Sequence, residues 1–436
     1  MRFPGQRKRK HYFPADTNKR ENAIEDIVKT ERTYIVGIDQ LLVDIECSVT
    51  EEFLKKEGLA KGESQILPDE QAGRIYDELV AEGRVIGEYA GGSVGNTLHN
   101  YSMLSDSKSV LLGAIKKAIN VGDYAFKYIR QTSARVDLNY LQPCPKAMGR
   151  AICFVTPDKE RTFGISKGCM NDWSEKYVPE DLVKNAGLLL LTAYLLRDEN
   201  SPIFKATVKA CDIALAAGVP IVFTLGTSLL ISEKRDFFKE FIRKYVTVAA
   251  MNETEAAAVT GIADPLLSSE KILDIADLVL ITVGAKGLYL SGWVDKKFAR
   301  QTESELHTKA IADYNINEFS RPMLRLDCEE PIKIYTHINP YLGGPDVIQS
   351  TNGAGDAALS ALLHDMSALC YFKTRYPNSD KLRVRALTYS SLSQIARYAN
   401  RVSFEVLTYN TPRLTHCLPE KEADLEDSYW SDYISK

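Results

Sequence analysis

The chain has 436 residues, 45% of them hydrophobic and 26% charged, which is the composition of a folded protein and excludes a disordered one. Its 54 lysines and arginines and 58 acids give a net charge of −4, which argues against nucleic acid or an acidic membrane as the main partner. The longest apolar run covers only residues 186–196, and a membrane span needs roughly 20 residues.

The cysteine pattern indicates a reducing compartment. Eight cysteines are scattered along the chain without a C-x-x-C pair, and no signal peptide is recognisable. We therefore expect free thiols in a cytoplasmic protein, with neither a disulfide framework nor structural zinc.

Taken in chain order, the sequence predicts a basic arm (1–33), one large domain (34–410) and an acidic tail (411–436). Within the domain, short apolar runs alternate with segments of helical period. The expected strands are Tyr34–Ile38, Ser109–Leu112, Leu188–Thr192, Pro220–Leu225, Thr247–Ala250, Leu278–Val283 and Leu288–Leu290. The expected helices are Asp69–Glu82, Asn96–Leu104, Asp123–Thr132, Ser201–Ala217, Ser232–Tyr245, Glu253–Thr260, Gly355–Leu369 and Leu387–Val406. This alternation predicts an α/β fold with a mostly parallel central sheet flanked by helices.

Two stretches depart from the alternation. Residues 134–170 alternate apolar and polar positions, as a β-hairpin or a small sheet does, and residues 293–347 read as a long mixed insertion. Several signatures are absent from the sequence: it has no Gly-Lys dipeptide and no H-E-x-x-H or H-R-D motif. P-loop enzymes, zincins and protein kinases are thereby excluded.

Two glycine clusters match patterns of other enzyme classes. Residues 91–95 (GGSVG) match the nucleophile elbow of serine hydrolases, and His364 or His416 lies downstream in the right order. A serine hydrolase is therefore one alternative. Residues 353–358 (GAGDAA) match a relaxed dinucleotide fingerprint, but no acid follows at about 20 residues and too little chain remains for that fold.

The second cluster also fits phosphoryl transfer. Glycines at a helix N-terminus expose backbone N–H groups, which together with the helix dipole attract an anion. Asp356 directly follows these glycines and could accept the proton of a hydroxyl group. A tight turn with an acidic residue in the first helical turn is the alternative interpretation.

Taken together, the motifs resemble those of the PfkB, or ribokinase-like, carbohydrate kinase family. TNGAGD (351–356) resembles its C-terminal signature and GGSVGN (91–96) its N-terminal one. Other matching segments follow in order over residues 34–406: LVDI (42–45), LG (112–113), GD (122–123), NETE (252–255), TVGAKG (282–287) and AN (399–400). The resemblance implies a ribokinase-like fold with a small β lid from about residues 45–92 and 134–170.

Within the family, the chain is similar to kinases of inosine and guanosine. The resemblance implies transfer of a phosphoryl group from ATP, with Mg²⁺, to the nucleoside 5′-hydroxyl. A sugar kinase of the same family remains an alternative. A monovalent cation and a homodimer are also open, and Ser350 stands where many relatives have an acid near the cation.

The resemblance also implies roles for individual residues. Asp356 would be the general base, and the three residues before it would form the anion hole: Gly353, Ala354 and Gly355. The ribose would be held by Asp44, Gly91, Gly92 and Asn96, with Ser93 as a mere linker.

Other matching residues would serve the phosphates and ATP. Arg161, in the lid, would reach the phosphates. Asn252 and Glu255 would order Mg²⁺ through water, although the pair also fits an ordinary helix cap. The ATP side would be lined by Thr282, Gly284, Gly287 and Asn400.

Overall fold

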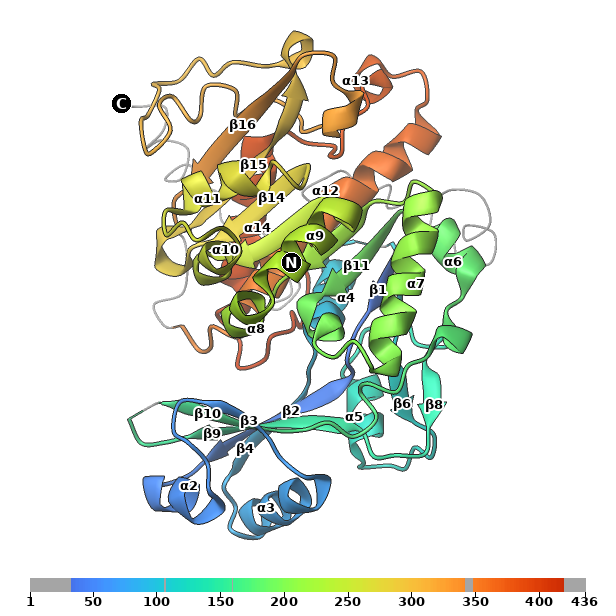
Figure 1. Ribbon diagram of the computed structural model, residues 1–436, viewed down its shortest axis with the longest axis vertical. Helices are drawn as coiled ribbons and strands as arrows, with labels where there is room; N and C mark the ends of the chain where they lie inside the picture. Colours follow the sequence, from blue (N-terminus) through green and yellow to red (C-terminus); the bar gives the residue numbers. More distant parts are fainter. Residues whose placement is uncertain (1–32, 106, 159, 342–347, 419–436) are drawn as a thin grey trace, which may run out of the picture.

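The computed structural model describes residues 33–105, 107–158, 160–341 and 348–418, and its centre is a nine-stranded sheet (Figure 1). The strands are β1 (Ile35–Ile38), β5 (Ser109–Leu112), β7 (Val136–Asp137), β11 (Leu188–Thr192), β12 (Ile221–Thr224), β13 (Val248–Asn252), β14 (Leu278–Thr282), β15 (Leu288–Asp295) and β16 (Pro331–Ile338). Their order is β16-β15-β14-β13-β12-β11-β1-β5-β7. All neighbours are parallel except β14 with β15 and β15 with β16. The predicted α/β fold with a mostly parallel sheet is confirmed.

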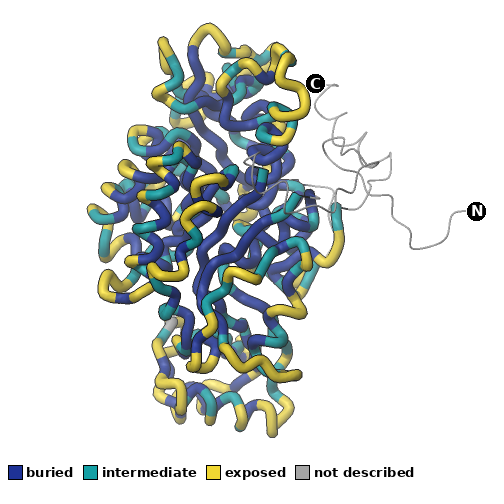
Figure 2. The backbone as a smooth tube through the Cα atoms, turned by 90° about the vertical axis from the view of Figure 1, so that its right-hand side faces the viewer, coloured by how far each residue is buried: buried dark blue, intermediate teal, exposed yellow. Residues whose placement is uncertain are grey.

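Helices cover both faces of this sheet because alternate residues of each buried strand point to opposite sides. Leu188 and Leu190 pack against one helical layer: α4 (Ser93–Leu104), α12 (Ala354–Arg375) and α14 (Leu392–Val406). Leu189 and Leu191 pack against the other: α6 (Glu180–Lys184), α7 (Pro202–Ala216), α8 (Ser228–Glu233), α9 (Arg235–Tyr245), α10 (Glu253–Thr260) and α11 (Pro265–Ile272). Figure 2 shows the resulting buried centre in dark blue.

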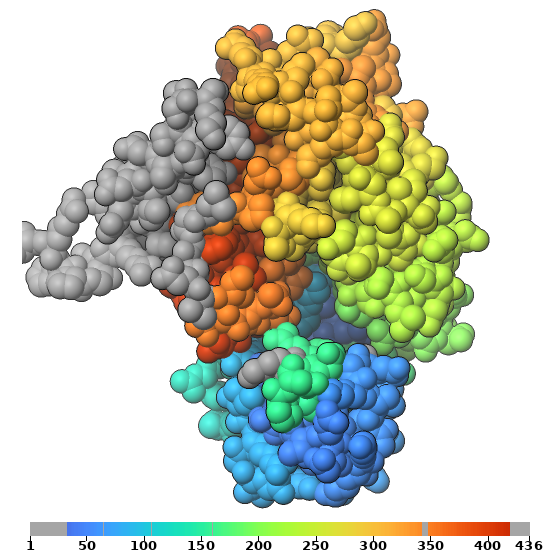
Figure 3. Space-filling model, turned by 90° about the vertical axis from the view of Figure 1, so that its left-hand side faces the viewer, coloured from blue at the N-terminus to red at the C-terminus, as the bar shows by residue number. Residues whose placement is uncertain are grey.

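A second, five-stranded sheet, called the lid below after the expectation from the sequence, lies beside the central domain. Its order is β3-β10-β9-β2-β4, from strands β2 (Leu42–Ser48), β3 (Ser64–Ile66), β4 (Val85–Ala90), β9 (Gly149–Val155) and β10 (Arg161–Ser166). Helices α2 (Glu51–Glu57) and α3 (Asp69–Ala81) bury one face of it through residues such as Phe53 and Ile75. The other face is only half-buried, and the surface is hollowed between the lid and the main body (Figure 3).

The structure differs from the expected elements in the lid and in two helices. Residues 134–148 do not join the lid, because β7 extends the central sheet and β8 (Gln142–Cys144) pairs with β6 (Ala114–Lys116). The helix expected over 232–245 is broken at Lys234, whose backbone is not helical. The last long helix begins at Leu392 instead of Leu387, since Ser391 caps it in a capping box. Two short helices, α5 (Tyr124–Arg130) and α13 (Asp380–Arg383), complete the α-helices among the described residues.

The predicted insertion and tail also differ from the structure. Within 293–347, residues 293–295 end strand β15 and Pro331–Ile338 are strand β16 of the central sheet, and the stretch from 296 to 330 between them contains no strand of that sheet. Residues 342–347 lie outside the described residues. Residues 411–418 of the predicted tail pack against α4, where Leu414 is fully buried. The rest of the tail, from 419, and the arm up to residue 32 lie outside the described residues.

The structure also bears on the cysteines and on the absence of a membrane span. All eight cysteines lie in the described residues, and none of them forms a disulfide there. None of the helices in the described part of the chain combines the length and the apolar character that a bilayer crossing requires.

Candidate active site

Most of the predicted site residues gather at the carboxyl ends of the parallel strands. Asp39 directly follows β1, Asn252 ends β13 and Thr282 ends β14. In open parallel sheets this edge forms the binding crevice. The N-terminus of α4 lies at the same edge, since the Gly95 N–H donates to Asp39, and Ser93 of α4 contacts Asp356 in the first turn of α12.

Asp356 lies in the first turn of α12 and is held by two side chains of α4. Ser93 Oγ donates to its Oδ1 at 2.5 Å, and Asn96 Nδ2 donates to its Oδ2 at 3.2 Å. Burial raises the pKa of Asp356 to about 6, while these two hydrogen bonds and the positive charge of Arg413 oppose the rise. The carboxyl group is thus mostly ionised at neutral pH and is basic enough to accept a proton. Ser93, expected to be only a linker, is a direct partner of Asp356.

The turn before Asp356 requires glycine at its first position. Gly353 has φ +78°, and a Cβ there would lie 2.4 Å from the Cβ of Pro412. Ala354 and Gly355 are the first helical residues, and a Cβ on Gly355 would meet open space. The N–H groups of this helix N-terminus have no partner within the helix and are available to an anion.

Asp39 is a site residue that the sequence motifs do not reveal. It is 2% exposed and accepts hydrogen bonds from the backbone N–H of Gly95 at 2.7 Å and of Gln40 at 2.9 Å. Burial raises its pKa to about 7. Gly92 must be glycine beside it, because its φ is +93° and a Cβ would lie 2.4 Å from the carboxylate. The only signal in the sequence is an acid directly after a buried strand.

From the sequence, Asp44 is expected just past the first predicted strand, Tyr34–Ile38, and this expectation is wrong. It does not lie just past the first strand of the central sheet but inside β2 of the lid, where it points to the half-buried face. A Cβ on Gly91 would lie 2.7 Å from the Asp44 carboxyl, so the absence of that atom makes room for the acid. Burial raises the pKa of Asp44 to about 7. The two glycines before α4 therefore lie between the carboxylates of Asp44 and Asp39.

Residues expected on the nucleotide side lie along the next strands of the same edge. Asn252 and Glu255 form a capping box at the start of α10, so the helix-cap interpretation of this pair is correct. Thr282 is paired in register with Asn252. Gly284 belongs to the turn after β14, and Gly287 ends that turn with φ +88°, where a Cβ would lie 1.9 Å from Ile338 O.

Three further predicted residues lie around this edge or in the lid. Asn400 of α14 donates to Asn339 O at 2.7 Å, just after β16. Arg161 begins β10 and shares the half-buried face of the lid with Asp44, according to the strand register. Ser350 accepts a hydrogen bond from the Asn352 N–H at 3.1 Å.

The donor set at this edge fits a magnesium ion held mainly by phosphates and water. Glu255 is 5% exposed, and burial raises its pKa to about 7. Nowhere in the described ranges do three or more His, Cys, Asp or Glu side chains come together as a metal cage. Mg²⁺ is commonly bound by one or two carboxylates together with substrate phosphates and waters, so the Glu255 carboxylate suits it.

The serine hydrolase alternative fails on geometry. Ser93 donates to an aspartate instead of a histidine. His99 is bonded to Leu414 O, His364 to the Tyr398 hydroxyl, and His416 lies beside the Tyr409 hydroxyl. The histidines of the described part of the chain therefore do not form a Ser-His-Asp triad with Ser93.

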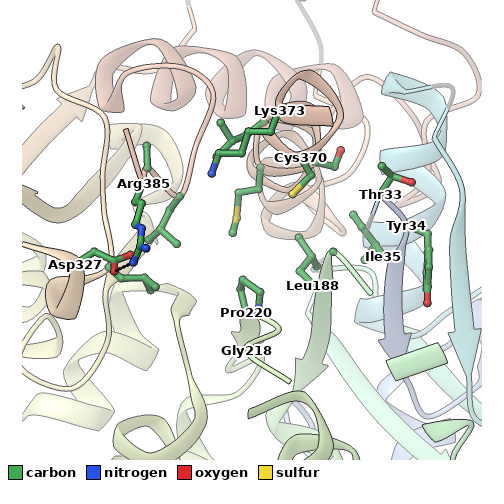
Figure 4. Close-up of a pocket in the computed structure, with 17 residues that line it drawn as sticks. Thr33, Tyr34, Ile35, Leu188, Gly218, Pro220, Asp327, Cys370, Lys373 and Arg385 are labelled. Atoms are coloured by element: carbon green, nitrogen blue, oxygen red, sulfur yellow. Dashed lines mark hydrogen bonds and ion pairs between the residues drawn. The ribbon is translucent and has the colours of Figure 1, made fainter. Parts of the chain in front are cut away.

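A cavity of about 530 Å³ lies at the opposite edge of the sheet, where β1, β11 and β12 begin (Figure 4). Its lining is mostly apolar and includes Lys373 and the ion pair of Arg385 with Asp327. None of the predicted site residues lines it.

Comparisons with known proteins agree on one family. The sequence model of the pfkB family carbohydrate kinases matches residues 62–310. The guanosine-inosine kinase of Escherichia coli K12 is 47% identical over 434 residues, which cover 99% of this chain and 100% of that protein. The adenosine kinase structure from Sinorhizobium meliloti and that of a probable sugar kinase from Rhizobium etli each have a TM-score of 0.64 at 18% identity. Each alignment covers 92% of this chain and 99% of the other, and at that identity it establishes the fold alone.

Proposed function

The chain belongs to the PfkB family of carbohydrate kinases, and we propose that it transfers a phosphoryl group from ATP to the 5′-hydroxyl of guanosine and inosine. The observation that carries this proposal is the full-length similarity to guanosine-inosine kinase, at 47% identity. The site supports the proposed chemistry. Asp356, held by Ser93 and Asn96, is a basic carboxylate that can accept a proton, and it lies beside a helix N-terminus that can bind an anion.

In the proposed reaction, Asp356 accepts the proton of the 5′-hydroxyl while the hydroxyl oxygen attacks the terminal phosphorus of ATP. The bond from that phosphorus to the bridging oxygen breaks, and ADP leaves. The N–H groups from Gly353 to Gly355 stabilise the negative charge of the transferring group. Positioning and electrostatics account for most of the rate in such transfers. Asp44 accepts hydrogen bonds from the ribose hydroxyls, and Gly91, Gly92 and Asn96 line the sugar.

The nucleotide is proposed to lie along the ends of β13 and β14, lined by Thr282, Gly284, Gly287 and Asn400. When bound, Mg²⁺ neutralises charge on the phosphates, and Asn252 and Glu255 would hold it through water. Arg161 and the lid strands close over the substrates and exclude water, which limits hydrolysis of ATP. A monovalent cation, a homodimer and a cytoplasmic location are further proposals; at the position where many relatives have an acid near the cation, this chain has Ser350.

The substrate assignment is tested with a panel of acceptors. With ATP and Mg²⁺, we expect kcat/KM to be highest for guanosine and inosine, and lower for adenosine, ribose and fructose. ADP formation is followed with each acceptor at equal concentration. A higher kcat/KM for a free sugar would make the protein a sugar kinase of the same family.

The pH dependence of activity reports on the base. Because Asp356 must be ionised to accept a proton, and burial raises its pKa to about 6, kcat/KM should fall as the pH drops through about 6. Ser93→Ala removes a hydrogen bond that favours the ionised form of Asp356. The fall of kcat/KM at low pH, the acidic limb of the pH profile, should therefore move to higher pH. Ser102→Ala, on the same helix but bonded to His99 O, is the matched control and should leave the limb in place. An acidic limb that Ser93→Ala does not move would contradict the role of Asp356.

A further inference from the structure

A short segment near the end of the described chain, residues 411–414, joins the two halves of the active site. Pro412 packs against Gly353, in the turn that leads to Asp356. Asn100 of α4 donates to Pro412 O at 3.1 Å and accepts from the Leu414 N–H at 2.8 Å. The segment is therefore fixed to both helices whose N-termini build the site, and Arg413 between these anchors has little freedom.

The Arg413 side chain is buried, with 3% of its surface exposed. Its Nε donates to Asn96 Oδ1 at 2.9 Å, and its Nη1 donates to Thr132 Oγ1 at 2.9 Å and to Gln131 O at 3.3 Å. The guanidinium lies over the Tyr128 ring, 5.3 Å from its centroid. Such a network keeps the planar group in one orientation.

This network decides which way the Asn96 amide faces. An amide group has one accepting oxygen and one donating NH₂ group. Because Arg413 can only donate, it must face the oxygen of Asn96, and the NH₂ group is then turned toward Asp356 Oδ2. Without Arg413 the amide could rotate and lose its contact with the base.

Arg413 also lies among several buried or half-buried acids without forming an ion pair with any residue of the described chain. Its positive charge lowers the pKa values of Asp356, Asp44 and Asp39 against the effect of their burial. Its Nη2 finds no hydrogen-bond partner among the described residues. The other titratable groups that interact with Asp356 are Glu255 and Tyr194, the latter bonded to Gly226 O. Arg413 is thus the cation that favours the charged form of these carboxylates.

We propose that Arg413 is a positioning residue of the phosphoryl transfer, which orients Asn96 toward the base and balances the negative charge of the site. This inference rests on the proposed function, since it assigns Arg413 a part in the same reaction. It extends the site to a segment that follows Asp356 by more than 50 residues.

Two variants separate the effect of orienting Asn96 from the effect of the positive charge of Arg413. Arg413→Lys keeps the charge but replaces the two separate nitrogens that bond Asn96 and Thr132 with a single one, so we expect kcat for guanosine to fall about tenfold and the acidic limb to move less than in a variant without the charge. Arg413→Gln loses the charge, so the acidic limb of kcat/KM should move up by about one pH unit. Thr132→Val is the matched control, because it removes one contact of Arg413 and leaves Asn96 bonded.

Each variant is assayed on its folded fraction, isolated by gel filtration and counted by guanosine binding in a calorimeter. If Arg413 has a purely structural role, its replacement should lower the folded fraction. The kcat and the acidic limb of the pH profile, measured on the protein that binds guanosine, should then stay unchanged. The inference is overturned if Arg413→Lys keeps kcat within twofold of wild type, and this variant decides the question even where Arg413→Gln does not fold. Failure of the proposed function itself would appear separately, as a wild-type protein that does not phosphorylate guanosine.

Discussion

Replacement of Asp356 by asparagine is expected to lower kcat by about 10²–10⁴-fold, which is the usual contribution of a general base. The amide has almost the shape of the carboxylate but cannot accept the proton of the 5′-hydroxyl. Ser93 can still donate to the amide oxygen, so the contact between α4 and α12 is largely kept. Guanosine binding, measured by calorimetry, should therefore change little while turnover collapses.

Asp365→Asn is the matched control for that variant. Asp365 belongs to the same helix, is fully buried and accepts N–H groups of Tyr389 and Ser390 at 2.7 and 3.1 Å. Its replacement should lower the melting temperature without changing kcat of the folded protein, because it lies away from the helix N-terminus. If Asp356→Asn behaved like Asp365→Asn, with kcat within a few-fold of wild type, another group would have to be the base.

Replacement of Asp44 by alanine is expected to weaken inosine binding at least about tenfold. A carboxylate beside the Gly91 backbone can accept hydrogen bonds from both the 2′- and 3′-hydroxyls, each worth roughly 1.5–3 kcal/mol. Loss of about 1.4 kcal/mol already corresponds to tenfold. The preference for inosine over 2′-deoxyinosine should also largely disappear, since the group that senses the missing hydroxyl is gone.

The ratio of kcat/KM for these two nucleosides is the measurement that decides the role of Asp44. Asp44→Asn retains one accepting oxygen and should lie between wild type and alanine. An unchanged preference ratio in Asp44→Ala would mean that this carboxylate does not hold the ribose.

The sequence motifs predict much of the site because they mark backbone requirements. The glycines at 91, 92 and 353 are needed for positive φ or for the close approach of a neighbouring group, and such positions are visible in a sequence. The alternation of buried strands and helices likewise predicts the central sheet, because each strand is covered on both faces.

The remaining parts of the site depend on contacts between distant segments. Arg413 belongs to no motif, and only the packing of Pro412 and Leu414 brings it to α4. Asp39 is a single acid after a strand, and its importance lies in its burial against Gly95. The sequence does not predict strand β16, which lies within the predicted insertion, because an irregular stretch of chain separates it from its pairing partner, β15.

The central claim is that this site transfers phosphate to the 5′-hydroxyl of guanosine and inosine, and the phosphorus NMR spectrum of the product tests it most directly. Wild-type protein with guanosine, ATP and Mg²⁺ should give guanosine 5′-monophosphate and ADP in equal amounts, and Asp356→Asn should give neither at a comparable rate. Phosphate on the 2′- or 3′-oxygen, or ADP formed with free phosphate in place of the nucleotide, would contradict the account.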